Sequence, residues 1–340
     1  MLSKSQLRTR LEFIGLVMAT SSIVGMIIAA SVTDGPLTAL VLVMGAAQGV
    51  VIGLGCSGSE VLILSNPSLR LARRFPPLVI VLLRALLYSA AILLGLSLPG
   101  LVMDVPRPWD EPNFAWVFAM SITVAGGFAF LTETLRLLGI EAAQSLLSGR
   151  YHRPRLEERV VLVADIAGST ELGEALGELR FHSFLADVAQ ELSPAIDRTG
   201  GAVHRYVGDA VFVTWPHRHG DEAVRALDCA RRMHHALARR DRAYQKAYFH
   251  SPRLRVAIHR GVLAAGVIGD WKKEIALLGD TMNTAARIET AAGKMDEAIV
   301  LSDAAAQALP DPLRADLRSL PPYEAAGKRA PLVLWAASVT

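Results

Sequence analysis

The first 132 residues alternate between long apolar runs and short polar connections. Each run approaches the roughly 20 residues that a helix needs to cross the hydrocarbon core of a bilayer. Because three comparable runs follow the first, we expect the first to be a span rather than a cleavable signal peptide. The four runs cover approximately residues 13–32, 37–55, 77–103 and 114–131.

Charged residues divide the connections between these runs into two kinds. The N-terminal segment, the second connection and the stretch after the fourth run are basic, whereas the first and third connections are acidic or mixed. The positive-inside rule then places both termini in the cytoplasm, as an even number of spans requires. We therefore expect a multi-pass protein of the inner or plasma membrane, with the lipid bilayer as a partner. The basic residues are Lys4, Arg8, Arg10, Arg70, Arg73, Arg74, Arg136, Arg150, Arg153 and Arg155, and the other two connections hold Asp34, Asp104, Arg107, Asp110 and Glu111.

Two features inside the spans allow alternative interpretations. Gly45, Gly49 and Gly53 recur every four residues, a spacing that lets helices approach closely. This spacing fits a dimer contact, but we favour packing within one four-helix bundle. Arg84 lies inside the third run; we favour a side chain that snorkels to the interface over pairing with Glu60 or Glu133.

The segment from Thr132 to Gly149 is expected to be helical. Leucines with alternating spacings of four and three indicate either a short coiled-coil seam or a helix that simply leaves the bilayer. A basic cluster over residues 150–155 ends the pattern and is suited to anionic headgroups. We expect a four-helix transmembrane domain at 1–132, a helical linker at 133–158 and a second domain at 159–340.

Short apolar runs and amphipathic segments alternate in the second domain. We expect strands and helices of one mixed sheet with helices packed on it, an α+β domain that follows the α-helical membrane bundle. The expected strands are residues 160–164, 202–207, 210–215, 254–258, 262–268, 274–278, 298–301, 314–320 and 331–338, and the expected helices are 171–197, as one or two pieces, 221–248 and 281–292.

Composition excludes several classes of protein. The net charge is only +3, with no basic stripe of the kind that nucleic-acid binding requires. Cys56 and Cys229 fit no disulfide, redox or metal spacing. The histidines, including His217, His219 and the pair at 234–235, lack partner ligands at a recognisable zinc spacing.

Two neighbouring motifs carry carboxylates at the ends of expected strands. Asp165 follows a buried-strand pattern and precedes Gly168-Ser169-Thr170, a turn into a helix whose backbone N–H groups suit phosphate. Asp209 follows Gly208 between two short apolar runs, which predicts a hairpin with a carboxylate at its tip. Taken alone, Asp165 could be a helix cap and Asp209 a turn residue. Together, two aspartates on adjacent strand ends can hold hard divalent cations.

A third motif, residues 278–289, completes the set. Asn283 and Arg287 are four apart and share one helix face. With three separate segments matching in the right order, residues 156–340 resemble the catalytic domain of class III nucleotidyl cyclases, which has a ferredoxin-like βαββαβ core.

The resemblance implies a reaction and roles for these residues. The 3′ hydroxyl of ATP would attack the α-phosphate to give 3′,5′-cyclic AMP and pyrophosphate, with two Mg²⁺ ions per site and Mn²⁺ as a possible substitute. Asp165, Asp209 and the carbonyl of Ile166 would hold the metal, Asn283 the ribose and Arg287 the phosphoryl charge. Lys328 would reach the triphosphate. The alternative for Lys328 is an exposed loop lysine without a role in binding, and the alternative for Arg287 is a residue on a solvated helix face.

Base choice and assembly also follow from the resemblance. Family positions that read the base hold Arg205 and Ala276 here. Arg205 can donate to adenine N1 but cannot accept from guanine, which favours ATP, whereas Ala276 cannot accept from the adenine amino group.

Family members place the aspartates of one chain against the Asn/Arg pair of another, so we expect a head-to-tail homodimer. The alternatives are a guanylate or dual-specificity cyclase, a non-catalytic nucleotide-binding receptor module and, less well supported, a transporter with a regulatory domain.

Overall fold

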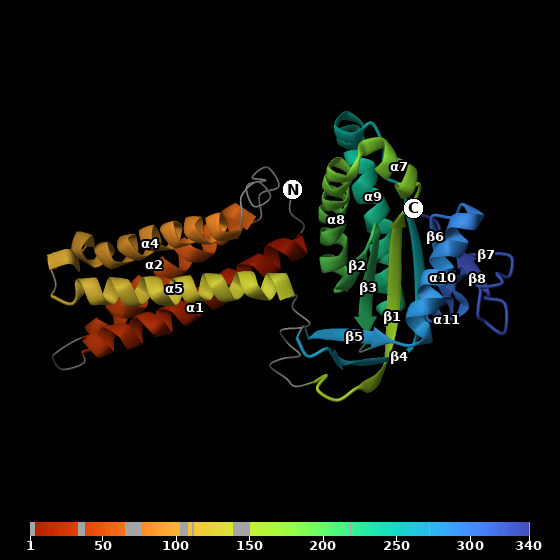
Figure 1. Ribbon diagram of the computed structural model, residues 1–340. Helices are drawn as coiled ribbons and strands as arrows, with labels where there is room; N and C mark the ends of the chain where they lie inside the picture. The colour runs from red at the N-terminus through yellow and green to blue at the C-terminus, as the bar shows by residue number, and fades with distance from the viewer. Residues whose placement is uncertain are drawn as a thin grey trace. The chain divides into compact units, whose positions relative to one another are not determined.

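The computed structural model describes residues 4–32, 38–64, 77–102, 108–110, 112–138, 150–217, 219–271 and 273–339. The chain divides into two compact units, residues 1–140 and 141–340 (Figure 1).

The first unit is helical. Each of its four long helices contains a stretch long and apolar enough to cross a membrane, so the four apolar runs of the sequence are confirmed as helices. Large apolar side chains such as Leu82 and Leu86 lie on the surface, as expected where lipid is the solvent. The elements are α1 (Lys4–Val32), α2 (Ala39–Leu64), α4 (Pro77–Val102), the 3₁₀ turn η1 (Pro108–Asp110) and α5 (Phe114–Leu138).

The glycines of α2 pack against α1 of the same chain. A Cβ atom at Gly45 would lie 2.6 Å from the carbonyl oxygen of Gly25, and one at Gly49 would lie 2.1 Å from that of Ser21. Only a residue without a side chain permits such a close approach of two helix backbones. The interpretation of these glycines as packing within one bundle is confirmed.

The favoured interpretation of Arg84 is wrong. Its guanidinium does not snorkel: the side chain is 1% exposed, and its Nε lies 3.0 Å from a carboxylate oxygen of Glu60. Tyr88 donates a hydrogen bond of 2.5 Å to the same oxygen. Pairing across α2 and α4 satisfies the charge inside the bundle, which removes the need to reach the membrane surface.

The second unit is an α+β domain with a mixed eight-stranded sheet. The strand order is β2-β3-β1-β4-β6-β8-β7, with β5 paired to β4, and among the described strands only the β4–β6 pair is parallel. The strands are β1 (Arg155–Ile166), β2 (Ala202–Val207), β3 (Ala210–Pro216), β4 (Leu254–Ile268), β5 (Glu274–Leu278), β6 (Ile299–Ser302), β7 (Arg318–Ser319) and β8 (Leu334–Ala336). The helices are α7 (Ser169–Leu176), α8 (Glu178–Thr199), α9 (Glu222–Tyr248), α10 (Asp280–Met295), α11 (Asp303–Ala306) and α12 (Asp311–Ala315).

Strand β1 lies centrally and separates two apolar cores. Alternate residues point to opposite faces of the sheet. Leu162 and Ala164 pack with α8 and α9, whereas Val161 and Val163 pack with α10. Figure 1 shows α8 and α9 on one side of β1 and α10 on the other. Asp165 continues the second series, so its carboxyl group emerges on the α10 face.

Four elements differ from expectation. The expected strand at 331–338 is reduced to β8, Leu334–Ala336. Residues 254–268 form one continuous strand, because His259, Arg260 and Gly261 pair with β1 instead of turning. Strand β1 begins at Arg155 rather than at residue 160. The expected strand at 314–320 shrinks to Arg318–Ser319, since the preceding residues form α12. Most of the expected linker helix lies outside the described residues.

Buried charges near the entry to the domain are paired. Arg159 is completely buried, and it donates to the hydroxyl of Tyr151 at 2.7 Å, to Glu157 at 3.0 Å and to the hydroxyl of Thr214 at 3.0 Å. These contacts join β1 and β3 to the first described residues after the linker.

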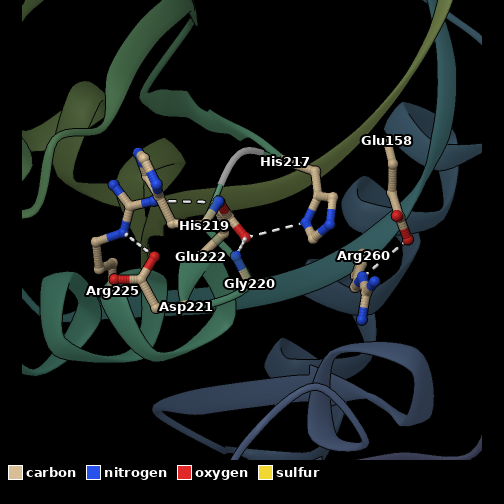
Figure 2. A network of polar contacts seen from close by, with 8 residues as sticks. All are labelled: Glu158, His217, His219, Gly220, Asp221, Glu222, Arg225 and Arg260. Carbon is tan, nitrogen blue, oxygen red and sulfur yellow. Dashed lines mark hydrogen bonds and ion pairs between the residues drawn. The ribbon is translucent and has the colours of Figure 1, made fainter.

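Figure 2 shows a second polar network, at the start of α9. The carboxylate of Glu222 contacts the His217 ring at 3.1 Å and accepts from the backbone N–H groups of His219 and Gly220. Nearby, Arg260 donates to Glu158 at 2.8 Å across β1 and β4. His217 therefore helps to hold the loop that precedes α9. Within the described part of the chain, no group of three or more His, Cys, Asp or Glu side chains is arranged for a metal.

Candidate active site

Asp165 and Asp209 meet at one end of the sheet. Strand β1 pairs with β3 up to Ala164↔Val211, so the next residue of β1 lies beside the turn that joins β2 to β3. That turn has only two residues, Gly208 and Asp209, and Gly208 has a φ of 60°, as such tight hairpins require. The two carboxyl groups are close enough to share a hydrogen bond when one is protonated.

A third carboxyl group, that of Glu289, joins them from α10. It is within hydrogen-bonding reach of Asp165, and the charge of Arg255 on β4 acts on it. Sequence reasoning missed Glu289, although its position two residues after Arg287 in the third motif was a usable signal. The residue is brought to Asp165 by the packing of α10 on β1.

This cluster holds three carboxyl groups and one nearby cation, Arg255, so negative charge is in excess when all are ionised. Burial, followed by the neighbouring carboxylates of Asp209 and Glu289, raises the pKa of Asp165 to about 7. Burial also raises the pKa of Glu289, and its hydrogen bond with Asp165 and the charge of Arg255 offset part of that rise. The cluster therefore favours either a bound proton or a bound cation.

These residues fit a divalent cation of the Mg²⁺ type. The Oδ2 atom of Asp209 is buried and has no hydrogen-bond partner among the described residues. Mg²⁺ is commonly held by one or two carboxylates, with water and substrate phosphate completing its coordination, so a set of three protein side chains is not required. The side chain of Ile166 is a hydrocarbon and is buried in the α8–α9 core, so the candidate ligand at this residue is its backbone carbonyl.

The start of α7 follows directly. Gly168 adopts a left-handed conformation, with φ of 71°, and turns the chain from β1 into the helix. Ser169 and Thr170 are the first helical residues, and no side chain caps this N-terminus. Backbone N–H groups at such a position suit a phosphate.

Asn283, Arg287 and Lys328 gather around the first half of α10. Asn283 is exposed and Arg287 is half-buried. The turn that carries Lys328 lies against this helix: a Cβ atom at Gly327 would be 3.2 Å from Nη2 of Arg287. Lys328 forms an ion pair with Asp280, the first residue of α10, and Thr284 donates to Asp280 at 3.2 Å.

Helix α10 thus carries two sets of polar residues on different sides. Residues advance by about 100° each along an α-helix, so Glu289 lies on roughly the opposite side from Asn283 and Arg287. Glu289 meets the carboxylates of its own chain, whereas Arg287 meets the Lys328 turn.

The two expected base-reading residues have different environments. Arg205 is exposed on β2, directly after a bulge that displaces His204 from the β2–β3 pairing. Ala276 is only 2% exposed on β5, so its side chain offers little surface to a ligand in a single chain. The charge of Glu274 on β5 acts on His204, which indicates that the two strands approach each other.

Known proteins resemble this chain in sequence and in fold. The chain is 34% identical over 244 residues to "Adenylate cyclase 2" of Rhizobium meliloti (strain 1021), which covers 71% of this chain and 66% of that protein, slightly less than two thirds of its length. The crystal structure of the adenylyl cyclase CyaB from P. aeruginosa matches with a TM-score of 0.50 at 21% identity, over 55% of this chain and 96% of that one.

A bacterial light-regulated adenylyl cyclase matches the fold with a TM-score of 0.56 at 16% identity, over 67% of this chain and 66% of that one. Residues 152–333, more than half of the chain, match the model for the adenylate and guanylate cyclase catalytic domain. The chain therefore belongs to the adenylate and guanylate cyclase family, with four apolar helices that fit a membrane bundle preceding its catalytic domain.

Proposed function

We propose that this protein is a membrane-anchored adenylate cyclase that converts ATP to 3′,5′-cyclic AMP and pyrophosphate. The observation that carries the proposal is the meeting of Asp165 and Asp209 at one sheet end, in a chain that also carries Asn283 and Arg287 four residues apart on one helix. A module that had lost catalysis would be expected to lack one of these residues, and all four are present.

Each group has a task in the proposed reaction. The ribose 3′ hydroxyl loses its proton and attacks the α-phosphate, and the bond to pyrophosphate breaks. Asp165, Asp209 and the Ile166 carbonyl would hold Mg²⁺, two ions per site by family resemblance, or Mn²⁺ instead. When bound, these ions supply Lewis-acid stabilisation of charge on the phosphates.

The remaining groups bind and orient the substrate. Asn283 would hold the ribose, and the guanidinium of Arg287 would bind the charged oxygens of the reacting phosphate as a fork. Lys328 would bind the outer phosphates, aided by the backbone N–H groups at Gly168, Ser169 and Thr170. The ion pair with Asp280 already holds Lys328 next to Arg287.

We propose further that two chains share each site. In one chain the carboxylates and the Asn283/Arg287 pair lie on different sides of α10, so a second chain is a natural source of the missing half. A head-to-tail homodimer with two equivalent sites follows.

Mixing inactive variants tests the sharing. Asp165→Ala and Arg287→Ala chains should each be inactive alone and recover about a quarter of wild-type activity when co-expressed, because half of the dimers then hold one intact site. Asp165→Ala mixed with Asp209→Ala is the matched control and should stay inactive, since every mixed site lacks one carboxylate. Mixed dimers that form without recovering activity would rule out shared sites.

ATP is the proposed substrate because Arg205 can donate to the adenine N1 atom and cannot accept from guanine. The specificity constants for ATP and GTP, measured with Mg²⁺ and with Mn²⁺ on the full chain, test this. ATP should be preferred, and incompletely, because Ala276 has no hydrogen-bonding group. Faster turnover of GTP would replace the proposal with a guanylate cyclase.

We propose that both termini and the catalytic domain face the cytoplasm, from the basic connections of the membrane half. Reporter fusions after residues 36, 70, 107 and 340 should report the outside, inside, outside and inside, respectively. A reporter at residue 340 found on the outside would contradict this orientation.

A further inference from the structure

Glu289 lies at a junction that the proposed reaction does not use. Asp165 of β1 pairs in register with Arg255 of β4, so these two side chains share one face of the sheet. Helix α10 covers that face, and Glu289 and Gly293 are one helical turn apart on it. A Cβ atom at Gly293 would lie 2.9 Å from Nη1 of Arg255, so the helix backbone rests directly on the guanidinium.

This packing leaves Glu289 between a cation and a candidate metal ligand. On one side it is within hydrogen-bonding reach of Asp165, and on the other it is near the charge of Arg255. The side chain is half-buried, so its position is set by its neighbours rather than by solvent. Glu289 therefore contacts a candidate metal ligand, and within the described residues no three His, Cys, Asp or Glu side chains are arranged to hold a metal.

We propose that Glu289 is a positioning residue for metal binding, which orients Asp165 and, together with Arg255, sets the charge that the cation meets. The inference rests on the proposed function for the identity of the metal ligands. The charges of the four side chains sum to −2 when all are ionised, and one divalent cation neutralises this. Carboxylates behind a metal ligand commonly change metal affinity 10–100-fold when they are replaced.

The same geometry gives α10 a role in both sites of the proposed dimer. Glu289 supports the carboxylates of its own chain, while Asn283 and Arg287 on the other side of the helix would serve the partner's.

The test is a Mn²⁺ titration of the full chain in detergent, without nucleotide, with free Mn²⁺ followed by electron paramagnetic resonance. Glu289→Gln keeps the shape and removes the charge, and we expect it to weaken Mn²⁺ binding about tenfold or more. Asp296→Asn is the matched control: it removes an exposed carboxylate at the end of the same helix, at a left-handed position that asparagine tolerates. It should bind Mn²⁺ like the wild type.

A second readout separates positioning from a general loss of structure. The Mn²⁺ concentration for half-maximal cyclase rate should rise about tenfold in Glu289→Gln, while the KM for ATP at saturating Mn²⁺ stays within about twofold of wild type. An unchanged Mn²⁺ titration overturns the inference, as does a weakened titration accompanied by an equal loss of ATP binding.

If Glu289→Gln does not fold, Glu289→Asp takes its place. The shorter side chain retreats from Asp165, and we expect Mn²⁺ binding to weaken about threefold, a fraction of the full effect; unchanged binding again overturns the inference. Failure of the proposed function looks different, because the wild-type chain would then bind Mn²⁺ and yet form no cyclic nucleotide from ATP or GTP.

Discussion

Both units of the molecule bury ionisable side chains, and they do so in opposite ways. In the helical unit, Arg84 forms an ion pair with Glu60, and Tyr88 donates a hydrogen bond to the same carboxylate. In the catalytic domain, Asp165, Asp209 and Glu289 gather, and the charge of Arg255 acts on Glu289. One arrangement is close to neutral and the other carries excess negative charge.

The contrast indicates which cluster holds the structure together and which is prepared for a ligand. A buried ion pair is retained only when its geometry is good, and loss of one partner leaves an uncompensated charge. Like charges held together are costly without a counter-ion, so their persistence in a fold points to a cation that completes them. Within the catalytic domain, Arg159 follows the first pattern, since Tyr151, Glu157 and Thr214 all accept from it.

Breaking the pair in the helical unit should give the largest loss of stability. Glu60→Gln leaves Arg84 buried without its counter-charge and should lower stability by about 3–5 kcal/mol. Arg84→Met should cost less, because it removes the more deeply buried charge and leaves Glu60 with the hydrogen bond from Tyr88. Thermal unfolding in detergent measures both, and Arg84→Met/Glu60→Met should recover most of the loss. Single variants as stable as the wild type would show that the pair is not structural.

Arg159→Met sharpens the comparison inside the catalytic domain. Loss of this cation removes the donor to the hydroxyl groups of Tyr151 and Thr214 and leaves the Glu157 carboxylate with Arg150 as its remaining ion pair, at a cost of about 3 kcal/mol. Because Arg159 is distant in the fold from Asp209 and its turn, the turnover per folded molecule should stay near wild type at low temperature. Cyclase rate normalised to the folded fraction from circular dichroism checks this. A specific loss of turnover in fully folded protein would give Arg159 a catalytic role.

Asp209→Asn should have the opposite sign from these substitutions. In the metal-free protein it removes one of the repelling charges next to Asp165 and should raise stability by about 1 kcal/mol, the scale of a partly exposed charge interaction. Mn²⁺ should stabilise the wild type against unfolding but should not stabilise Asp209→Asn. Thermal unfolding with chelator and with Mn²⁺ compares the two states. A destabilised metal-free variant would argue against repulsion in the native cluster.

The pH dependence of metal-free stability is the smallest and most specific effect. The folded pKa of Asp165 is raised to about 7, above the unfolded value near 3.9, so the folded state binds this proton more tightly. Its contribution to stability is present below about pH 4 and is lost as the pH rises through 7. The unfolding temperature in chelator should therefore fall by a few degrees between pH 5 and 8, and Asp209→Asn should flatten that slope. A flat profile for the wild type would contradict the raised pKa.

Much of this organisation could be predicted from local sequence. Runs of about 20 apolar residues favour helices that satisfy their own backbone polar groups, so the four long apolar helices followed from length and composition. The hairpin at Gly208-Asp209 also followed, because a two-residue turn with a positive φ favours glycine. The residues proposed for chemistry came from motifs, and their assignment to a site remains a prediction.

Other features depended on contacts between distant parts of the chain. Residues 254–268 contain a histidine, an arginine and a glycine that favour a break, but pairing with all of β1 keeps them extended. Arg84 is buried because Glu60, on another helix, neutralises it. Local patterns do not contain this information, since partners distant in sequence determine whether a charge can be buried.

The sequence by itself determined the division into an apolar helical half and an α+β half, and the residue types available for phosphate and metal chemistry. Only the tertiary structure decided which carboxylates meet and that Glu289 lies near both Asp165 and Arg255. The physical reason is that composition and periodicity act over a few residues, whereas the energy of a charge depends on everything that packs around it.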